Sequence, residues 1–456
     1  MAEWPARFAQ QRQHLSIRRT PLSEELRKQA VDIYNNGLAH ITPEALLRNA
    51  LSLDGDTLVL NFLEGEQRVP LSKNGTIRLF SVGKAAAPLA MKAHQILGEL
   101  VSEGLVVTKT GFGLEGMPYL QIEAAHPVPD ANGEQAAKAA AEMAKRTGKE
   151  DILLVLVSGG ASALLPSPLP GVSLADKQAL AEQMLRTEMD IHQINHVRKA
   201  ISQLKGGGLA SLAANATVVG MYLSDVPGDD MASIGSGPTI PEAVNSKSVI
   251  GLLQEKGLWE TTPEAIRKIL EDGSAEAAKK PPTKTPINGL IGTNRHLLYA
   301  MADAAREMGY LTWVEEASTT GLNAEALPRL LGEWEDFSRQ HRDVAVCRIS
   351  GGETLVEVRG SGMGGRCQEL AALMMPKLAE EDVFLAAGSD GNDGPTDAAG
   401  GVVDRESWEK INALKIPYAD LLKDNDSYHL LERSGNLIKV PPTRNNVSDV
   451  HLFIRA

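Results

Sequence analysis

The chain has 456 residues, of which 43% are hydrophobic and 23% charged, a composition ordinary for globular proteins of two or three domains. Its net charge of -12 argues against general nucleic-acid binding, which needs a basic surface. The longest purely apolar run, residues 152–157, is far shorter than the roughly 20 residues of a membrane-spanning helix. We therefore expect no nucleic-acid partner and no membrane partner.

Two cysteines, Cys347 and Cys367, are too few for a disulfide framework and are typical of a reducing compartment. The first 20 residues lack the apolar segment of an export signal. Together these features predict a cytoplasmic protein. The sequence allows a homo-oligomer without requiring one. In so acidic a chain, an anionic substrate needs local positive charge, so Lys and Arg in glycine-rich loops are the side chains of interest.

Residues 1 to about 72 are expected to be mostly helical, because their apolar residues recur at spacings of three and four. The first α/β unit follows over residues 76–97 and consists of a strand, a tight turn and an alanine-rich helix. Lys84 would lie at the carboxyl end of that strand. It is not a Walker A lysine, because Arg78 occupies the first glycine position and Ala85 replaces the Ser or Thr.

Two further apolar runs end in glycine-rich loops. The first leads into GFGLEG at 111–116, which matches G-x-G-x-x-G, but Pro118 follows and no helix begins, so a loop is expected. The second run, DILLVLV, ends in a loop of small residues whose amides and hydroxyls suit an anion, with tight packing at the turn as the alternative. The residues of this second loop are Ser158, Gly159, Gly160 and Ser162.

A long helical stretch is expected from Ser173 to Leu204. Lys205 and the glycines 206–208 would end it and form a second anion site. Another strand then leads to Asp225 and to GSGPT at 235–239. Repeated transitions from strand to polar loop predict one mostly parallel sheet with its loops at one edge, where open α/β sheets bind ligands.

The composition changes from Glu242 to about Pro286, where Lys and Pro cluster. We therefore predict an α/β protein of two domains with a cleft between them. The first, residues 1–285, would be a Rossmann-like α/β/α sandwich with a helical N-terminal segment and a linker from about 242. The second, residues 286–456, would be an α/β domain that begins with a strand, a turn at Asn294 and a helix.

A second G-x-G-x-x-G, at residues 360–365, follows an expected strand and precedes an expected helix. Asp390 ends the next strand, roughly where a ribose-binding acid belongs, so a nicotinamide cofactor is one reading. Against it, the preceding strand over 353–360 alternates apolar and charged residues, whereas the first strand of a Rossmann unit is buried on both faces. Arg366 at the helix start suits a phosphate or carboxylate directly.

The loop that follows strand 383–386 contains Asp390, Asp393 and Asp397 among glycines. These carboxylates could bind a metal ion or accept a proton, and a solvated turn is the alternative. A calcium-binding EF-hand loop is excluded, because its twelfth position counted from Asp390 is Gly401 rather than Glu.

Ten short segments, in the same order along the chain, resemble the glycerate 2-kinase family, whose C-terminal part is the MOFRL domain. The segments are SVGKA at 81–85, AAHPVPD at 124–130, VSGGASALL at 157–165, LKGGGLA at 204–210, SDVPGDD at 224–230, GSGPT at 235–239, GTN at 292–294, SGGE at 350–353, GGRCQEL at 364–370 and AAGSDGNDGPTDAAG at 386–400. They span nearly all of the chain after residue 76. One departure is the pair Arg444 and Asn445, where the family tends to have Gly and Thr.

The resemblance implies an ATP-dependent kinase that phosphorylates D-glycerate at its 2-hydroxyl to give 2-phosphoglycerate and ADP, with Mg²⁺. It also implies that the second domain is of the MOFRL type. Because many members carry the label hydroxypyruvate reductase, an NAD(P)H-dependent reductase is the alternative function. A third reading is a protein that binds the same ligands without turnover.

The resemblance also assigns roles to the candidate residues. Lys84 and Arg366 would neutralise the charge of the transferred phosphoryl group. Asp225 and Asp390 would bind Mg²⁺ or accept the proton of the 2-hydroxyl, in an order that the sequence leaves open. The residues expected to bind substrate and nucleotide are Ser158, Gly159, Gly160, Ser162, Lys205, Gly206, Gly207, Gly208, Asn294, Glu353, Gly364 and Gly365.

Overall fold

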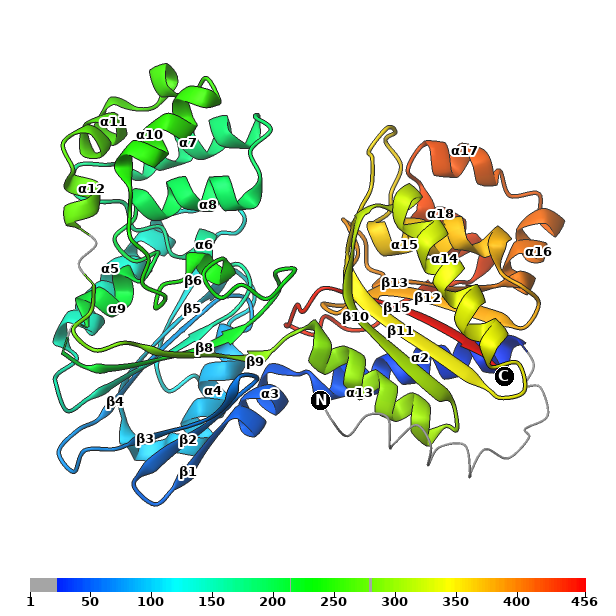
Figure 1. Ribbon diagram of the computed structural model, residues 1–456, viewed down its shortest axis with the longest axis horizontal. Helices are drawn as coiled ribbons and strands as arrows, with labels where there is room; N and C mark the ends of the chain where they lie inside the picture. Colours follow the sequence, from blue (N-terminus) through cyan, green and yellow to red (C-terminus); the bar gives the residue numbers. More distant parts are fainter. Residues whose placement is uncertain (1–22, 214, 279–280) are drawn as a thin grey trace. The chain divides into compact units, whose positions relative to one another are not determined.

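The computed structural model describes residues 23–456 except 214 and 279–280, and Figure 1 shows its elements. The chain forms two compact units. We call residues 43–292 the central unit, and residues 23–42 together with 293–456 the terminal unit. The start of the predicted helical segment, residues 1–22, lies outside the described residues. Among the described helices, none combines the length and the apolar character needed to cross a membrane.

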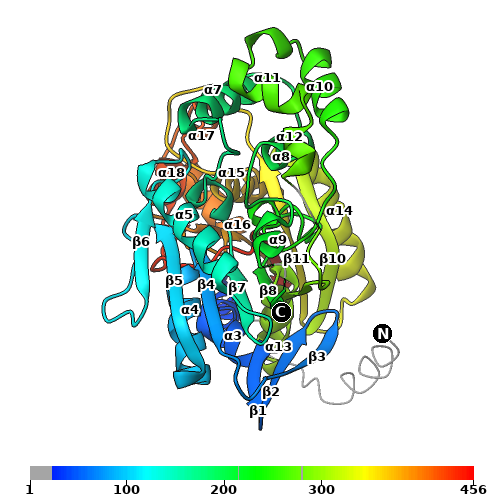
Figure 2. The same ribbon diagram turned by 90° about the vertical axis from the view of Figure 1, so that its left-hand side faces the viewer.

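The central unit contains a six-stranded sheet in which every neighbouring pair is parallel, in the order β6-β5-β4-β7-β8-β9. Figure 2 shows β6, β5, β4, β7 and β8 side by side. The strands are β4 (Ile77–Val82), β5 (Val101–Lys109), β6 (Leu120–Ala124), β7 (Ile152–Val157), β8 (Thr217–Leu223) and β9 (Ile287–Gly292). The prediction of a parallel sheet with helical connections is confirmed.

Helices of small residues pack on this sheet. In α5 (Ala131–Arg146) the buried residues are mostly alanines, which allow the helix to approach the strands closely. Strand β7 is buried at all its positions, as its unbroken apolar run predicts. The other helices next to the sheet are α3 (Pro43–Ala50), α4 (Ala86–Leu97), α6 (Ala161–Leu164) and α9 (Gly208–Leu212).

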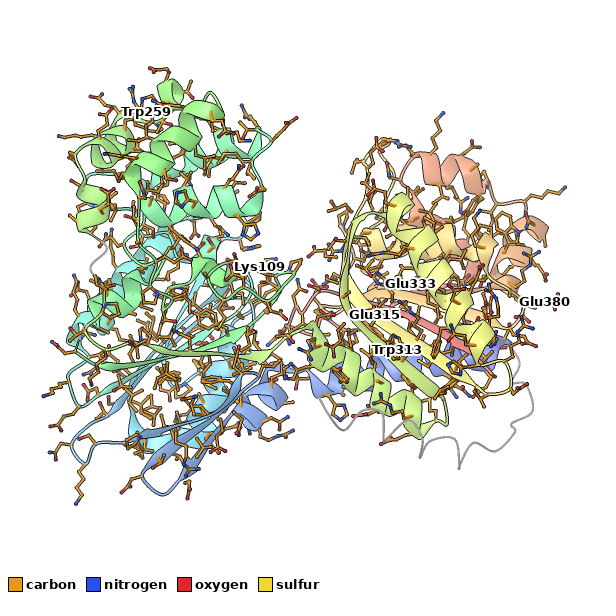
Figure 3. The ribbon with its side chains drawn as sticks, in the orientation of Figure 1. Lys109, Trp259, Trp313, Glu315, Glu333 and Glu380 are labelled. Carbon is orange, nitrogen blue, oxygen red and sulfur yellow. The ribbon has the colours of Figure 1, made fainter. Side chains whose placement is uncertain are left out.

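Five helices form a separate cluster in the central unit, and Figure 3 labels Trp259, which packs against the core of this cluster. We call it the helical cluster. Its members are α7 (Leu174–Leu185), α8 (Ile191–Ala200), α10 (Ser246–Glu255), α11 (Glu264–Glu271) and α12 (Ser274–Ala277). The single helix expected over 173–204 is wrong, because Asp190 accepts a hydrogen bond from Gln193 N at 2.8 Å and starts α8 anew.

The helical prediction for residues up to about 72 is also wrong in part. Residues 51–70 form a three-stranded antiparallel sheet, β1 (Leu51–Asp54), β2 (Thr57–Phe62) and β3 (Gly65–Pro70). Gly55 lies in the first turn and Gly65 begins β3 directly after the second, with φ of 57° and 128°, a conformation that favours glycine. These turns reverse the chain and commit the intervening residues to hairpins.

Two elements belong to a different unit from the one expected. Strand β9, expected to open the second domain, pairs with β8 and completes the central sheet. Helix α2 (Ser23–His40), expected in the first domain, packs in the terminal unit. There Tyr34 Oη donates to Gly388 O at 2.7 Å, and Gly37 leaves no room for a Cβ against Leu297 and Met301.

The terminal unit is built on a mixed sheet of order β10-β11-β15-β12-β13-β14, in which only the pair β10 and β11 is parallel. Its strands are β10 (Leu311–Leu322), β11 (Val346–Leu355), β12 (Asp382–Gly388), β13 (Gly400–Asp404), β14 (Leu437–Ile438) and β15 (Asp449–Arg455). Its helices besides α2 are α13 (Asn294–Glu307), α14 (Asn323–Gln340), α15 (Arg366–Met374), α16 (Arg405–Ala413), α17 (Tyr418–Lys423) and α18 (Ser427–Ser434).

Aromatic stacking and buried polar pairs hold this sheet to α14. Trp334 stacks on Phe453 of β15, with ring centroids 5.2 Å apart, and its Nε1 donates to Asp382 Oδ2 at 2.9 Å. Arg348 of β11 is 3% exposed and pairs with two glutamates, Glu315 of β10 and Glu333 of α14, both labelled in Figure 3. The core is therefore specified by polar contacts as well as by apolar burial.

We expect Leu154→Ala in β7 to lower the free energy of opening of the central sheet by about 2–5 kcal/mol, because Leu154 is fully buried and truncation leaves a cavity. Native-state hydrogen exchange of the β4 and β7 amides measures this opening. The control is Leu120→Ala in β6, which is 60% exposed and should change it by less than about 0.5 kcal/mol. Equal exchange in both variants would contradict the assignment of β7 to the centre of the core.

Candidate functional site

The first cluster of candidate residues lies at the carboxyl ends of β4 and β7. The register pairs Val82 with Val157, so the two strands end level and the residues that follow them meet. Lys84 N donates to Gly159 O at 2.8 Å, and Ala85 N donates to Ser158 Oγ at 3.1 Å. The predicted proximity of these two loops to each other therefore follows from strand pairing.

Gly83 is needed for this contact. Its φ is 126°, and a Cβ at this position would collide with Ser158. Gly83 O also accepts a hydrogen bond from Thr108 Oγ1 at 3.1 Å, which ties the turn to β5. The turn that presents Lys84 is thus fixed from both neighbouring strands.

The loop after β7 offers two backbone donors. Within the described part of the chain, the N–H groups of Gly159 and Gly160 donate to no other atom. Gly160 has a φ of 84°, and a Cβ there would lie 3.3 Å from His126 Nε2 and 3.4 Å from Lys84 Cγ. Two amides without a described acceptor, beside a lysine side chain, are suited to binding an anion.

His126 borders the same loop as a neutral ring. Burial, and then the positive charges of Lys84 and Lys109, lower the pKa of His126 to about 4. Lys109 ends β5 and is labelled in Figure 3. At neutral pH the ring is therefore a hydrogen-bonding group without charge, and the two lysines supply the positive potential.

Asp225, which follows β8, brings a carboxylate to this cluster. A Cβ on Gly159 would collide with Asp225 Oδ2, so the carboxylate packs directly on the loop after β7. Burial raises the pKa of Asp225, and the ammonium of Lys84 opposes that shift. The structure therefore brings Lys84, the loop after β7 and Asp225 together.

Lys205 joins the cluster through Ser162. Its Nζ donates to Ser162 O at 2.7 Å and to Ser162 Oγ at 2.8 Å, and Ser162 Oγ lies 3.0 Å from Ser236 Oγ. The three glycines after Lys205 have their N–H groups bonded to backbone carbonyls, those of Ser236, Gly237 and Lys205. In this arrangement the glycines position Lys205, and the lysine side chain faces the loop after β7.

The second cluster lies in the terminal unit and centres on Arg366. Its guanidinium contacts Asp449 through Nε and Nη2, the latter at 2.9 Å, and its Nη1 lies 2.9 Å from Glu353 Oε1. Three of the five N–H donors of a guanidinium are thus engaged. Asp449 is 1% exposed, so the ion pair holds Arg366 in one orientation.

Asp390 lies beside this pair. A Cβ built on Gly388 would be 3.3 Å from Asp390 Oδ1 and 3.5 Å from Asp449 Oδ1, so both carboxylates converge on one point. Burial raises the pKa of Asp449, Arg366 opposes the shift, and Asp390 adds to it. Sequence reasoning missed Asp449, although it lies only four residues after Asn445, in the segment where this chain departs from the resembling family.

Asp393 and Asp397 have structural roles. The Asp393 carboxylate accepts hydrogen bonds from Cys367 N at 3.2 Å and Gln368 N at 2.8 Å and so caps the N-terminus of α15. Burial raises the pKa of Asp393 to about 7. Asp397 is exposed and pairs with Lys439 at 3.0 Å. Of the three aspartates in this loop, only Asp390 remains available for chemistry.

The glycines of the second G-x-G-x-x-G, residues 360–365, pack tightly against other segments of the terminal unit. Side chains at Gly360 and Gly362 would collide with Asp424, and a side chain at Gly365 would collide with Asp393. Strand β11 ends at Leu355, and β15 lies between β11 and β12. The segment therefore lacks the βαβ unit with adjacent parallel strands that a dinucleotide fingerprint requires. Gly364, likewise, packs on Ser427.

Two further candidates support the loop before β15. Asn294 Nδ2 donates to Val447 O at 2.7 Å and to Asp449 O at 3.0 Å, which fixes the backbone at Asp449. Asn445 is buried and donates from Nδ2 to Ile41 O at 2.6 Å. Arg444 beside it is exposed, with a φ of 58°.

Groups of three or more His, Cys, Asp or Glu side chains arranged to bind a metal ion are absent from the described residues. The two tentative metal ligands, Asp225 and Asp390, each belong to a different unit. A Mg²⁺ ion that arrives with a nucleotide needs only one or two protein carboxylates, because phosphates and water complete its coordination. Each aspartate fits that smaller requirement.

The chain matches two protein families in succession. Residues 29–271 match a domain of unknown function, DUF4147, and residues 346–449 match the MOFRL family. Among curated proteins, the chain is 32% identical over 444 residues to the glycerate 2-kinase of Pyrococcus horikoshii, covering 95% of this chain and 98% of that protein. It is 35% identical to the D-glycerate 2-kinase of Thermotoga maritima, with 94% and 98% covered.

The similarity extends to a human protein and to solved structures. The human glycerate kinase is 31% identical, with 96% of this chain and 95% of that protein covered. The crystal structure of glycerate kinase from Thermotoga maritima superposes with a TM-score of 0.84 at 32% identity, over 95% of this chain and 100% of that one. A Pyrococcus horikoshii structure gives a TM-score of 0.83 at 31% identity, over 94% and 98%.

We expect Lys84→Ala to raise the pKa of His126 above its value of about 4, because the nearest positive charge is removed. Histidine NMR titration measures the shift, with the resonance assigned through His126→Gln. Lys109→Ala should raise it less, and Lys92→Ala on the outer face of α4 should leave it unchanged. A larger effect of Lys109 would contradict the placement of Lys84.

The lowered pKa of His126 also determines how the stability of the fold changes at acid pH. Because the unfolded chain binds the His126 proton near pH 6.5 and the folded chain only near pH 4, this group destabilises the fold as pH falls between those values.

We expect Arg444→Gly to stabilise the protein by about 0.5–1 kcal/mol, because relief of the left-handed backbone exceeds the entropy that glycine adds to the unfolded chain. The unfolding midpoint in urea measures it. Arg329→Gly, at an exposed position inside α14, should have the opposite sign and cost about 1 kcal/mol. A destabilised Arg444→Gly variant would show that the arginine side chain itself stabilises the loop.

Proposed function

Because the chain belongs to the glycerate 2-kinase family, we propose that it transfers the γ-phosphoryl group of ATP to the 2-hydroxyl of D-glycerate, giving 2-phosphoglycerate and ADP. The observation that carries the proposal is the anion site at the end of β4 and β7. There the side chain of Lys84 packs beside Gly160, and the backbone N–H groups of Gly159 and Gly160 donate to no described atom. A phosphate or a carboxylate satisfies all three groups.

Phosphoryl transfer needs alignment of the reactants and neutralisation of the charge on the moving group. We assign the neutralising charge to Lys84 of the central unit and Arg366 of the terminal unit. Arg366 retains two N–H donors beyond those engaged by Asp449 and Glu353, which allows it to bind a phosphate oxygen without breaking its ion pairs. Each cation therefore has a defined support: the turn at Gly83 for one, and the Asp449 ion pair for the other.

The 2-hydroxyl must lose its proton as the new P–O bond forms. Asp225 is the better acceptor of the two candidate aspartates, because burial raises its pKa and so increases its basicity. Asp390 is then the oxygen ligand for the metal. This division is our proposal for the order that the sequence left open, and the variants described below test it.

Mg²⁺ fits the donors around Gly388. Asp390 supplies one carboxylate, and Asp449 lies close to it, but Asp449 is already bound to Arg366. The Asp390 carboxylate accepts one hydrogen bond, from Asn392 N to Oδ1 at 3.0 Å, and a single carboxylate suits a Mg²⁺ ion that is bound mainly by ATP phosphates and water. When bound, the ion neutralises part of the phosphate charge. Lys84 and Arg366 supply the rest from the protein.

The remaining candidates bind or position substrate. Ser158 shapes the turn at Lys84, Ser162 and Lys205 extend the anion site, and Gly206–Gly208 hold Lys205 in place. Asn294 fixes the backbone of Asp449. D-glycerate and ATP are the proposed partners, and two buried cysteines without a disulfide accord with a cytoplasmic location.

The NAD(P)H-dependent hydroxypyruvate reductase is not favoured. The sequence feature that suggests a reductase is the second G-x-G-x-x-G, but its glycines pack on the segment around Asp424. The similar proteins described above are named kinases.

We expect Lys84→Ala and Arg366→Ala each to lower kcat/KM by roughly 10²–10³-fold, because each removes transition-state charge stabilisation. The assay is ADP release with ATP, Mg²⁺ and D-glycerate, with the phosphate position read by phosphorus NMR. Asp225→Asn should lower kcat with little change in the Mg²⁺ requirement. Asp390→Asn should raise the Mg²⁺ concentration needed for half-maximal rate.

Matched controls are Lys92→Ala in α4 and Arg405→Ala in α16, which should keep wild-type rates. Because Arg366→Ala leaves Asp449 buried without its cation, Arg366→Lys serves as a second variant that keeps the charge but not the bidentate contact. Full activity in both alanine variants would refute the assignment of the two cations. A product phosphorylated at the 3-hydroxyl would refute the proposed regiochemistry.

A further inference from the structure

A pocket of about 300 Å³ lies in the central unit, between the helical cluster and the loops that follow β6 and β7. Its volume is at the lower end of the range for small-molecule sites. Gly160, Ser162 and Lys205 line it, so the pocket is continuous with the anion site beside Lys84. The helical cluster provides most of its other lining residues. The sequence predicts none of these as functional.

Arg198 of α8 is the most informative lining residue. Its side chain is half-buried against the pocket, and no acidic side chain of the described residues forms an ion pair or hydrogen bond with it. Burial lowers the pKa of Arg198, and no neighbouring carboxylate offsets that shift. A guanidinium without a counter-ion in a pocket is a site that an anion would complete.

Lys199, the next residue in the sequence, differs from Arg198 because it has an acidic partner. Lys199 is also buried, but Glu242 accepts from its Nζ at 2.8 and 3.0 Å. The protein thus neutralises a buried cation where one faces its interior. It leaves Arg198 uncompensated where the side chain faces the pocket.

The rim of the pocket is apolar. Val128 and Leu185 line the pocket and are 64% and 68% exposed, while Met184 and Ile201 also line it and are buried. Large exposed apolar side chains that line a cavity favour an apolar ligand group. D-glycerate has no such group, whereas the adenine base of ATP does.

We propose that this pocket binds the adenine nucleotide, with the base between Val128 and Leu185 and the phosphate chain along Arg198 towards Lys205 and Lys84. The inference rests on the proposed kinase function and adds to it the location of one substrate. D-glycerate then binds on the other side of Lys84. The γ-phosphoryl group lies at the anion site where the two substrates meet.

The experiment compares two probes on each variant, a fluorescent N-methylanthraniloyl ATP and inorganic tripolyphosphate as its competitor. Arg198→Ala should weaken both probes roughly 10- to 100-fold, because it removes a charge-assisted contact with phosphate. Leu185→Ser should weaken the ATP analogue by about fivefold and leave tripolyphosphate unchanged, because it removes only apolar contact with the base. Steady-state KM values for ATP should follow, with KM for D-glycerate unaltered.

Matched controls are Arg48→Ala on α3 and Leu120→Ser on β6, both exposed and outside the pocket, which should bind both probes as the wild type does. Circular dichroism checks that each variant is folded. Wild-type nucleotide affinity in both Arg198→Ala and Leu185→Ser, in an enzyme that phosphorylates glycerate, would overturn the pocket assignment alone. So would a rise in KM for D-glycerate without one for ATP.

Failure of the proposed function has a different signature. A wild-type protein that binds the ATP analogue with these dependences but does not phosphorylate D-glycerate would refute the acid substrate and leave the pocket assignment standing. A wild-type protein that neither turns over nor binds the analogue would overturn both.

Discussion

The parallel pairing of β4 with β7 is the constraint on which the central unit's site depends. Two strands that run in the same direction and end level must deliver their following residues to the same place. Hydrogen bonds between the two turns then remove the remaining freedom, and the absence of a Cβ at Gly83 lets them touch. The backbone at Lys84 is therefore positioned by strand pairing and by the hydrogen bonds between the two turns.

In the terminal unit, a cation is held against a buried part of the sheet. Arg366 lies next to the fully buried Asp449, and the pair is stable because each charge satisfies the other. Glu353 restricts the orientation of the Arg366 guanidinium further, and the Asn294 side chain fixes the backbone of Asp449. One unit thus orients a flexible lysine through its turn, and the other orients an arginine through a fixed carboxylate.

Local patterns predicted those parts of the fold that depend on local chemistry. The mostly apolar sequences of β4 and β8 and the unbroken apolar run of β7 predict buried parallel strands, and the small residues after β7 suggest the anion site that we propose. The sequence predicts neither Asp449 nor Arg198 as a functional residue, for the same reason. Asp449 is important because it pairs with the distant Arg366, and Arg198 because no acidic side chain of the described residues pairs with it. Neither property depends on residues adjacent in the sequence. Helical spacing predicts a helix over residues 51–70 and across residue 190, but the turn at Gly55 and the N-cap at Asp190 override that spacing in the structure.

The terminal unit is assembled from two separated stretches of chain, and this has a consequence for synthesis on the ribosome. Helix α2 emerges early, yet the elements that cover its apolar stripe, α13 and the strands around β12, are made only after the whole central unit. At roughly 5–20 residues per second, residues 293–456 take on the order of 10–30 s to appear. During that interval the nascent chain carries a complete central unit beside a helix whose buried face still has no partner, the kind of surface that chaperones bind.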